Sequence, residues 1–201
     1  MNYLYHGSVI ANIHIIKAES TLHGTDNTKV FYLTDNLPYS LFYIWDSSHN
    51  IKRNKHVTAW IKDGIVYYEE QFEGQLKAFY KGVSGYVYCV ESNENFKPVE
   101  NRESMWFSET DSAVFKTFII SDVYSEIMKY ANEGKVKIIN FDEVSKERIT
   151  DLYNIITQRI IKSGLLNNTD STDAKFYQTY FSKAWNDALK ESTISWHLNG
   201  S

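Results

Sequence analysis

The dipeptide Asp63-Gly64 constrains the fold of this chain more directly than any other feature. It joins two short runs, residues 56–62 and 65–70, that are rich in β-branched and aromatic side chains. An Asp-Gly pair readily takes the positive φ angles of the two-residue turn whose twist matches that of antiparallel strands. These residues therefore predict a β-hairpin, and with it a fold that contains antiparallel sheet.

Other segments before residue 142 have the same character. Short apolar runs bounded by Gly, Asp and Asn predict strands over residues 4–8, 30–34, 86–90, 105–108, 114–120 and 135–141. A short helix is expected over residues 37–45, where Pro38 fits the first turn, and another over residues 122–132, which Gly134 ends. Residues 18–29 are predicted to form a loop. Strands mixed with short helices indicate an α+β fold.

The sequence changes character after residue 141. Apolar side chains at helical spacing predict an amphipathic helix that Gly164 ends, and after a polar loop an aromatic-rich helix over residues 174–189. No further core strand is expected in this part. We therefore predict a strand-rich domain over residues 1–141 and a C-terminal helical appendage, residues 142–201, packed on it.

Composition narrows the classes of function. The net charge of −4 and the pI near 5.9 provide no general basic field, so nonspecific nucleic-acid binding is not expected. No signal peptide and no apolar run of membrane-spanning length stand out, and the single cysteine, Cys89, lies in an apolar strand, where we expect it to be buried. These features predict a cytoplasmic protein with no membrane partner. Six scattered histidines lack the spacing of a metal site, so no metal is expected.

One ordered set of residues points to a specific chemistry. Tyr5-His6-Gly7-Ser8 is followed by a strand that contains Tyr32, and then by Ser40 and Tyr43 in the short helix. The two tyrosines are 43 − 32 = 11 positions apart, and Ser40 precedes the second by three. This order and spacing resemble the NAD pocket of the ADP-ribosyltransferase superfamily, in its poly(ADP-ribose) polymerase-like branch and as a small domain of the bacterial or phage type. The resemblance covers about residues 1–141. It implies two small, largely antiparallel sheets around a cleft, with flanking helices.

The resemblance also implies roles for the first motif, with NAD as the substrate. His6 would hydrogen-bond a ribose hydroxyl, and Gly7, followed by Ser8, would let backbone groups reach the nicotinamide amide without a Cβ in the way. Taken alone, a His-Gly dipeptide in a strand is more typical of packing and a turn.

The second motif would supply the walls of the pocket. Tyr43 and Tyr32 would hold the nicotinamide ring, and the Ser40 hydroxyl would complete the contacts to the amide. Because the chain has 15 tyrosines, a single tyrosine is more typical of the core, and only the ordered set departs from that.

The chain lacks a carboxylate at one position where the resembled branch has one. The resembled branch usually places a Glu at the start of a late strand, where it stabilises the developing positive charge, but this chain has Met105 there. By strand alternation Glu103 and Glu109 would share the face of Met105, displaced by roughly 7 and 14 Å. Glu103, through a bulge, and Glu109 are therefore the candidate catalytic residues, although a solvated strand edge explains both equally well. Glu69 and Glu70 are further candidates.

The expected function is mono-ADP-ribosyl transfer from NAD to an unknown macromolecular acceptor. Met105 motivates an alternative, a catalytically silent module that binds NAD or ADP-ribose. RNA 2′-phosphotransferase-related activity is another, but it requires clustered Arg and His that do not stand out here. A last alternative is a partner-binding protein whose aromatic C-terminal helix presents Tyr177, Phe181 and Trp185 outward.

Overall fold

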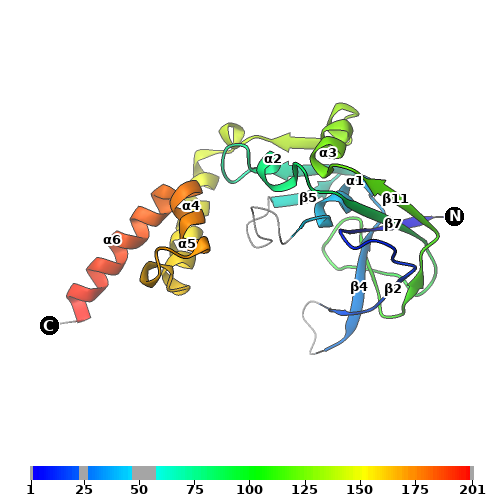
Figure 1. The fold of residues 1–201 in the computed structure, drawn as a ribbon, viewed down its shortest axis with the longest axis horizontal. Helices are drawn as coiled ribbons and strands as arrows, with labels where there is room; N and C mark the ends of the chain where they lie inside the picture. The colour runs from blue at the N-terminus through cyan, green and yellow to red at the C-terminus, as the bar shows by residue number, and fades with distance from the viewer. Residues whose placement is uncertain (1, 23–26, 47–57, 200–201) are drawn as a thin grey trace. The chain divides into compact units, whose positions relative to one another are not determined.

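The structure is a computed structural model that describes residues 2–22, 27–46 and 58–199, with side chains described up to residue 193. The chain divides into two compact units. The first comprises Met1–Glu70 and Gly74–Ile139, and the second comprises Gln71–Glu73 and Asn140–Ser201. Figure 1 shows the strands in the first unit and the long helices α4 and α6 in the second.

A seven-stranded antiparallel sheet forms the centre of the first unit. Its strands follow the order β11-β7-β1-β4-β9-β8, and β3 pairs with β4 as well. The bounds are β1 (Tyr3–Ser8), β3 (Ser20–Thr21), β4 (Lys29–Thr34), β7 (Gly85–Glu91), β8 (Lys97–Pro98), β9 (Met105–Ser108) and β11 (Lys116–Ile120). In this order the strands that carry His6, Tyr32 and Met105 are direct neighbours.

The predicted hairpin belongs to a second sheet. Strands β5 (Thr58–Lys62) and β6 (Ile65–Glu69) are antiparallel, and β12 (Val136–Ile139) runs parallel to β6. Asp63 and Gly64 have φ angles of 53° and 75°, which confirms the predicted turn. Residues 56 and 57 of the predicted strand lie outside the described residues.

A third, two-stranded sheet pairs β2 (Ile15–Ile16) with β10 (Ser112–Ala113). The α+β class with mostly antiparallel pairing is therefore confirmed. The expectation of two small sheets is wrong, because one sheet has seven strands. A loop over the whole of residues 18–29 is also wrong, because β3 and the start of β4 fall within that range.

The helices of the first unit follow local capping signals where such signals exist. Asn36 caps α1 (Leu37–Ser40), which continues as the 3-10 turn η1 (Leu41–Tyr43), and Asp122 caps α3 (Val123–Asn132) by accepting from Ser125 N at 2.7 Å. Helix α2 (Gln75–Tyr80) was not predicted from the sequence. Its orphan N–H groups are met by a carboxylate from the preceding turn, because Glu70 accepts from Gly74 N at 3.2 Å and from Leu76 N at 2.9 Å.

The two faces of the seven-stranded sheet are buried by different elements. One face holds a compact apolar cluster whose buried members are Leu4, Ile16, Phe31, Leu33, Tyr88, Val90 and Phe96. Side chains alternate along a strand, so Gly7 lies on the opposite face from Leu4. There α1 and η1 approach β1, and the side chain of Ile44, directly after η1, is completely buried.

The second unit is helical, with α4 (Lys146–Lys162), α5 (Thr172–Tyr180) and α6 (Ser182–Asn199). The prediction of one helix over residues 174–189 is wrong, because Phe181 takes φ −133° and ψ 44° and separates α5 from α6. The outward placement of aromatic side chains is wrong as well. Tyr177, Phe181 and Trp185 are only 4%, 3% and 7% exposed, because they form the core of this unit. These three side chains are therefore not available as a docking surface.

Phe72 completes the same core. Its ring centroid lies 4.3 Å from that of Tyr180, 5.7 Å from that of Phe181 and 6.1 Å from that of Phe176. A segment of three residues from the middle of the chain therefore folds with the C-terminal helices.

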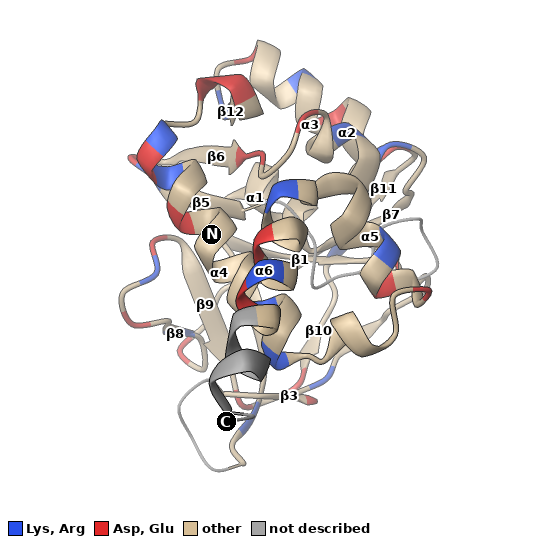
Figure 2. Ribbon diagram, turned by 90° about the vertical axis from the view of Figure 1, so that its left-hand side faces the viewer, with Lys and Arg blue, Asp and Glu red and all other residues tan. Residues whose placement is uncertain are grey.

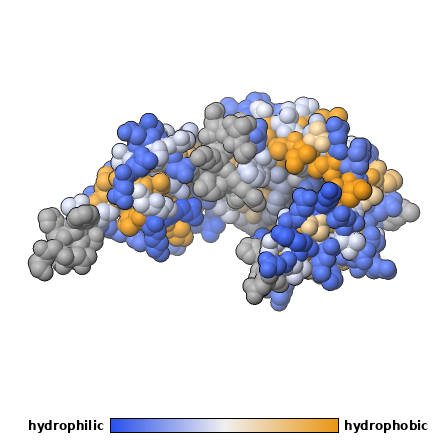
Figure 3. All heavy atoms as spheres, turned by 60° about the horizontal axis from the view of Figure 1, so that its bottom comes forward, coloured by the Kyte–Doolittle hydropathy of each residue, from blue (hydrophilic) through white to orange (hydrophobic). Residues whose placement is uncertain are grey.

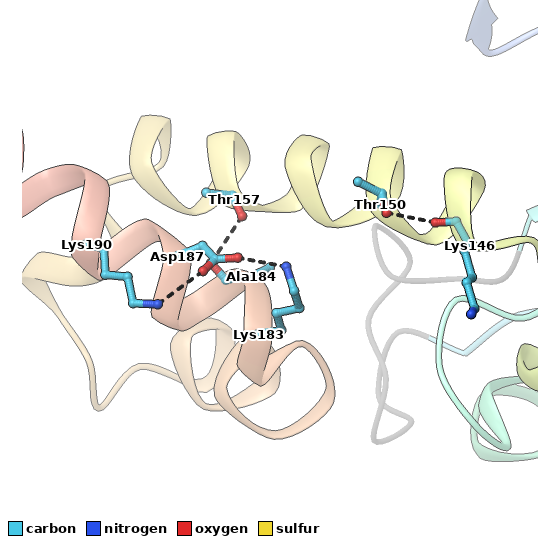
Figure 4. A network of polar contacts seen from close by, with 7 residues as sticks. All are labelled: Lys146, Thr150, Thr157, Lys183, Ala184, Asp187 and Lys190. Carbon is cyan, nitrogen blue, oxygen red and sulfur yellow. Dashed lines mark hydrogen bonds and ion pairs between the residues drawn. The ribbon is translucent and has the colours of Figure 1, made fainter.

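Polar contacts add to this packing (Figure 4). The Thr157 hydroxyl of α4 donates to the Ala184 carbonyl of α6 at 3.2 Å, and Asp187 lies 3.0 Å from Lys183 and 3.7 Å from Lys190. The buried Thr157 contact ties the two helices together, whereas the ion pairs are exposed and contribute little.

Charged residues of both signs are interspersed along the ribbon of both units (Figure 2). Apolar surface is also visible on the first unit in Figure 3, and its exposed large apolar residues are Val9, Ile10, Ile15, Phe115 and Ile119. None of the helices in the described part of the chain combines the length and apolar composition needed to cross a bilayer.

Candidate functional site

Gly7 is fixed in place by a close backbone approach. A Cβ at this position would lie 2.0 Å from the carbonyl oxygen of Ser40 and 3.1 Å from Cγ1 of Ile44. Only glycine lets the end of α1 lie this close to β1. The structure thus brings the first motif against the second, and it gives Gly7 a packing role in addition to the one implied by the resemblance.

Ser40 takes part in this approach through its backbone, while its side chain turns back into the helix. The hydroxyl donates to the carbonyl of Leu37 at 2.7 Å, and the residue is completely buried. Contact with a nicotinamide amide would require this hydroxyl to rotate or to accept a second hydrogen bond. Ser8 likewise has a local partner, because its hydroxyl accepts from Ile10 N at 3.1 Å just after β1 ends.

The His6 ring joins β1 to β4. Its Nδ1 lies 3.0 Å from the carbonyl oxygen of Tyr32, and burial lowers the pKa of the imidazole. Since a carbonyl only accepts, Nδ1 carries the proton of the neutral ring, and Nε2 is left with its lone pair. An acceptor nitrogen of this kind suits a hydroxyl group such as that of a ribose.

Strand alternation separates the His6 side chain from the rest of the set. Tyr5 pairs with Thr34, and Thr34 pairs with Met105, so these three side chains share one face and His6 lies on the other. Tyr32, two residues before Thr34, shares the Met105 face, and its hydroxyl lies 3.4 Å from the Thr21 carbonyl of β3. The contact of His6 with this part of the sheet is therefore the one between its ring and the backbone carbonyl of Tyr32.

The Tyr43 side chain contacts Met105, the residue at the position where a carboxylate is expected from the resemblance. The Tyr43 hydroxyl lies 3.4 Å from the Met105 sulfur, and Met105 is only 5% exposed. A thioether is a weak acceptor and cannot stabilise a cation as a carboxylate does. The structure thus places Met105 beside Tyr43 of the second motif.

Several other aromatic residues surround Tyr43. Its ring packs edge-on against Phe42 and Tyr39, with centroids 5.1 and 5.7 Å away, and Tyr68 of β6 lies 6.4 Å from Phe42. The Tyr80 hydroxyl donates to the Phe42 carbonyl at 3.0 Å. These contacts hold the η1 turn, and with it Tyr43, in one orientation.

Tyr68 was not among the predicted site residues. It is completely buried, burial raises its pKa well above the ordinary value, and its hydroxyl finds no hydrogen-bond partner among the described residues. An unpaired buried hydroxyl costs roughly 1–3 kcal/mol. The alternation of residues 65–69 could identify a buried tyrosine, but not its place beside η1, because that depends on how β6 packs.

The two candidate carboxylates have other partners. Glu103 precedes β9 in a turn that includes Ser104 at φ 59°, so strand alternation does not extend to it, and its Oε1 accepts from Gly64 N at 2.9 Å. Glu109 follows β9 and forms an exposed ion pair with Lys97 at 3.0 Å. The expectation that both would share the face of Met105 as part of one strand is therefore wrong. A catalytic role for either stays a prediction.

The remaining candidates are structural or have no assigned role. Glu70 caps α2, as described above, and Glu69 is only 9% exposed. Cys89 is buried, as predicted, and burial raises the pKa of its thiol, which disfavours a nucleophilic thiolate. Among the described residues no group of three His, Cys, Asp or Glu side chains could hold a metal ion.

No family model, curated protein or solved structure matches this chain.

Proposed function

We propose that the first unit binds NAD at the site formed by β1, β4, η1 and β9, and that it transfers ADP-ribose to a macromolecular acceptor. The observation that carries the proposal is the convergence of three separated motifs. Gly7 lies against the Ser40 carbonyl, His6 bonds the backbone of Tyr32, and Tyr43 contacts Met105. These contacts, together with the order and spacing of the three motifs along the chain, support an NAD pocket.

The chemistry follows from the groups at this site. Cleavage of the bond between nicotinamide and ribose passes through an oxocarbenium-like transition state, which must be oriented and stabilised. Among the described residues β1 and β4 pair only at Tyr5 and Thr34, so NAD would lie across the two strands beyond that pair. His6 Nε2 would accept a hydrogen bond from a ribose hydroxyl on one face of the sheet, and the Tyr43 and Tyr32 rings would hold the nicotinamide on the other, each stack contributing roughly 0.5–1.5 kcal/mol. A nucleophilic group of the acceptor would then bond to the anomeric carbon as the bond from that carbon to nicotinamide breaks, with nicotinamide leaving and the proton of the acceptor passing to solvent.

The contact between Tyr43 and Met105 favours a second candidate, a module that binds NAD or ADP-ribose without turnover. The expected place of the carboxylate is filled by a buried thioether. Orientation by His6 and Tyr43 would then give affinity without stabilising the charge that develops in the transition state.

Calorimetric titration of NAD into the wild type, His6→Ala and Tyr43→Ala, with nicotinamide release followed in the same samples, tests both candidates. The exposed His14 supplies a matched control, His14→Ala. Binding that requires His6 and Tyr43, accompanied by release, supports the transferase, and binding without release supports the silent module. Absence of binding to the folded wild type would refute both.

A further inference from the structure

The tip of the β5–β6 hairpin is held by two side chains from elsewhere in the first unit. Gly64 lies beyond the last strand pair, Lys62 with Ile65, so its peptide groups are not part of the ladder. Its N–H donates to Glu103 Oε1 at 2.9 Å, and its carbonyl accepts from Asn36 Nδ2 at 2.9 Å. We call this arrangement of Asn36, Gly64 and Glu103 the hairpin clamp.

The hairpin clamp joins three segments that each carry part of the candidate site. Asn36 caps α1 by accepting from Tyr39 N at 3.1 Å, and this helix leads directly into η1 and Tyr43. Glu103 lies two residues before Met105, in a turn tied to the end of β4 by a hydrogen bond from Asp35 N to the Ser104 carbonyl at 3.2 Å.

The hairpin itself contributes β6, whose Tyr68 packs beside Phe42 in η1. A displacement of the hairpin would therefore move one of the aromatic neighbours of η1.

We propose that Glu103 is a positioning residue, which holds the β5–β6 hairpin against the α1 cap and thereby fixes η1 and Tyr43 for NAD. This inference rests on the proposed function and reassigns Glu103 from chemistry to positioning. The clamp needs an acceptor oxygen at residue 103 but not a negative charge. Catalysis through charge needs the ionised carboxylate.

The two roles predict different behaviour for Glu103→Gln and Glu103→Ala. Glutamine keeps an acceptor oxygen for Gly64 N–H, so amide exchange at Gly64 and NAD affinity should stay within about twofold of the wild type. Alanine removes the acceptor, so exchange at Gly64 should accelerate and NAD affinity should fall by roughly two- to tenfold, as expected for the loss of one hydrogen bond. A charge-stabilising Glu103 would instead lose turnover in both variants and keep its affinity in both.

The experiment measures hydrogen exchange at Gly64, NAD affinity by calorimetry and nicotinamide release from NAD, all on the full chain. Glu100→Ala, at an exposed glutamate of the same connection between β8 and β9, is the matched control and should change none of these quantities. Asn36→Ser serves as a second variant, because serine can still cap α1 but cannot reach the Gly64 carbonyl. It should lower NAD affinity as Glu103→Ala does, while the Gly64 N–H keeps its acceptor on Glu103.

Each outcome decides the proposal. Fast exchange at Gly64 in Glu103→Gln, or unchanged NAD affinity in Glu103→Ala despite faster exchange, would overturn the positioning role. If the wild type protects Gly64 but does not bind NAD, the proposed function is wrong, and the positioning role for NAD is overturned with it even though the clamp exists. Equal loss of turnover in both Glu103 variants would identify a catalytic carboxylate.

Discussion

Substituting Gly7 by alanine tests the closest approach in the candidate site. The new Cβ would stand 2.0 Å from the Ser40 carbonyl oxygen, whereas real Cβ contacts essentially never fall below 3.0 Å, so β1 and α1 must separate by at least 3.0 − 2.0 = 1.0 Å. The obstructing atom belongs to the backbone and cannot rotate away. Gly7 is not among the glycines with positive φ, so the cost is steric and not conformational.

Overpacking of this kind costs typically 1–3 kcal/mol, and we expect Gly7→Ala to fall at the upper end, at about 3 kcal/mol. For a chain of this size that corresponds to a decrease of about 6 to 12 °C in Tm. Urea unfolding followed by circular dichroism, together with a thermal melt, measures the change. NAD affinity should fall as well, because Ser40 and Tyr43 lie on the displaced segment.

Gly82→Ala is the matched control for this experiment. Gly82 has φ 82° and open space around its Cβ position, so alanine there costs only the left-handed backbone strain, roughly 1–2 kcal/mol. A Gly7→Ala protein within 1 kcal/mol of the wild type would refute the close approach of α1 to β1. It would also remove the packing explanation for this glycine.

Three further predictions concern other parts of the molecule. Met105→Glu should raise nicotinamide release from NAD at least tenfold if the site lacks only a carboxylate, because Tyr43 could then donate to it; an unchanged rate would show that the site lacks more than this group. Because burial lowers the pKa of His6, the unfolded chain binds more protons, so the free energy of unfolding should fall as the pH drops from about 6.5 toward the lowered pKa. His6→Gln should remove that part of the pH dependence, as pH-resolved urea unfolding of both proteins would reveal. Phe72→Ala should destabilise the second unit by about 3–5 kcal/mol, because its ring is 5% exposed among aromatic neighbours; hydrogen exchange in α5 and α6 that matches the wild type would contradict this.

Sequence patterns predicted correctly the elements whose formation depends on residues close in sequence. The Asp63-Gly64 turn, the helix predicted over residues 122–132 and the strand over residues 105–108 all depend on residues close in sequence, and the structure has them there. Helix α2 was missed, because its N-terminal acceptor, Glu70, is separated from it by a turn. The single C-terminal helix was wrong because Phe181 breaks it to enter the core, and periodicity cannot signal that.

For the candidate site as well, some features follow from the sequence and others only from the tertiary structure. The sequence by itself determined which residue types occur in which order, from His6 to Tyr43, and that a methionine, Met105, stands where the resemblance predicts a carboxylate, because motif order and spacing are properties of the chain. Only the tertiary structure decided that Tyr43 contacts Met105, that Gly7 meets Ser40 through its backbone, and that Glu103 holds Gly64. The physical reason is that these contacts join segments from 33 to 62 residues apart, as 40 − 7 = 33, 103 − 64 = 39 and 105 − 43 = 62 show. Their geometry depends on strand order and packing, which no local pattern specifies.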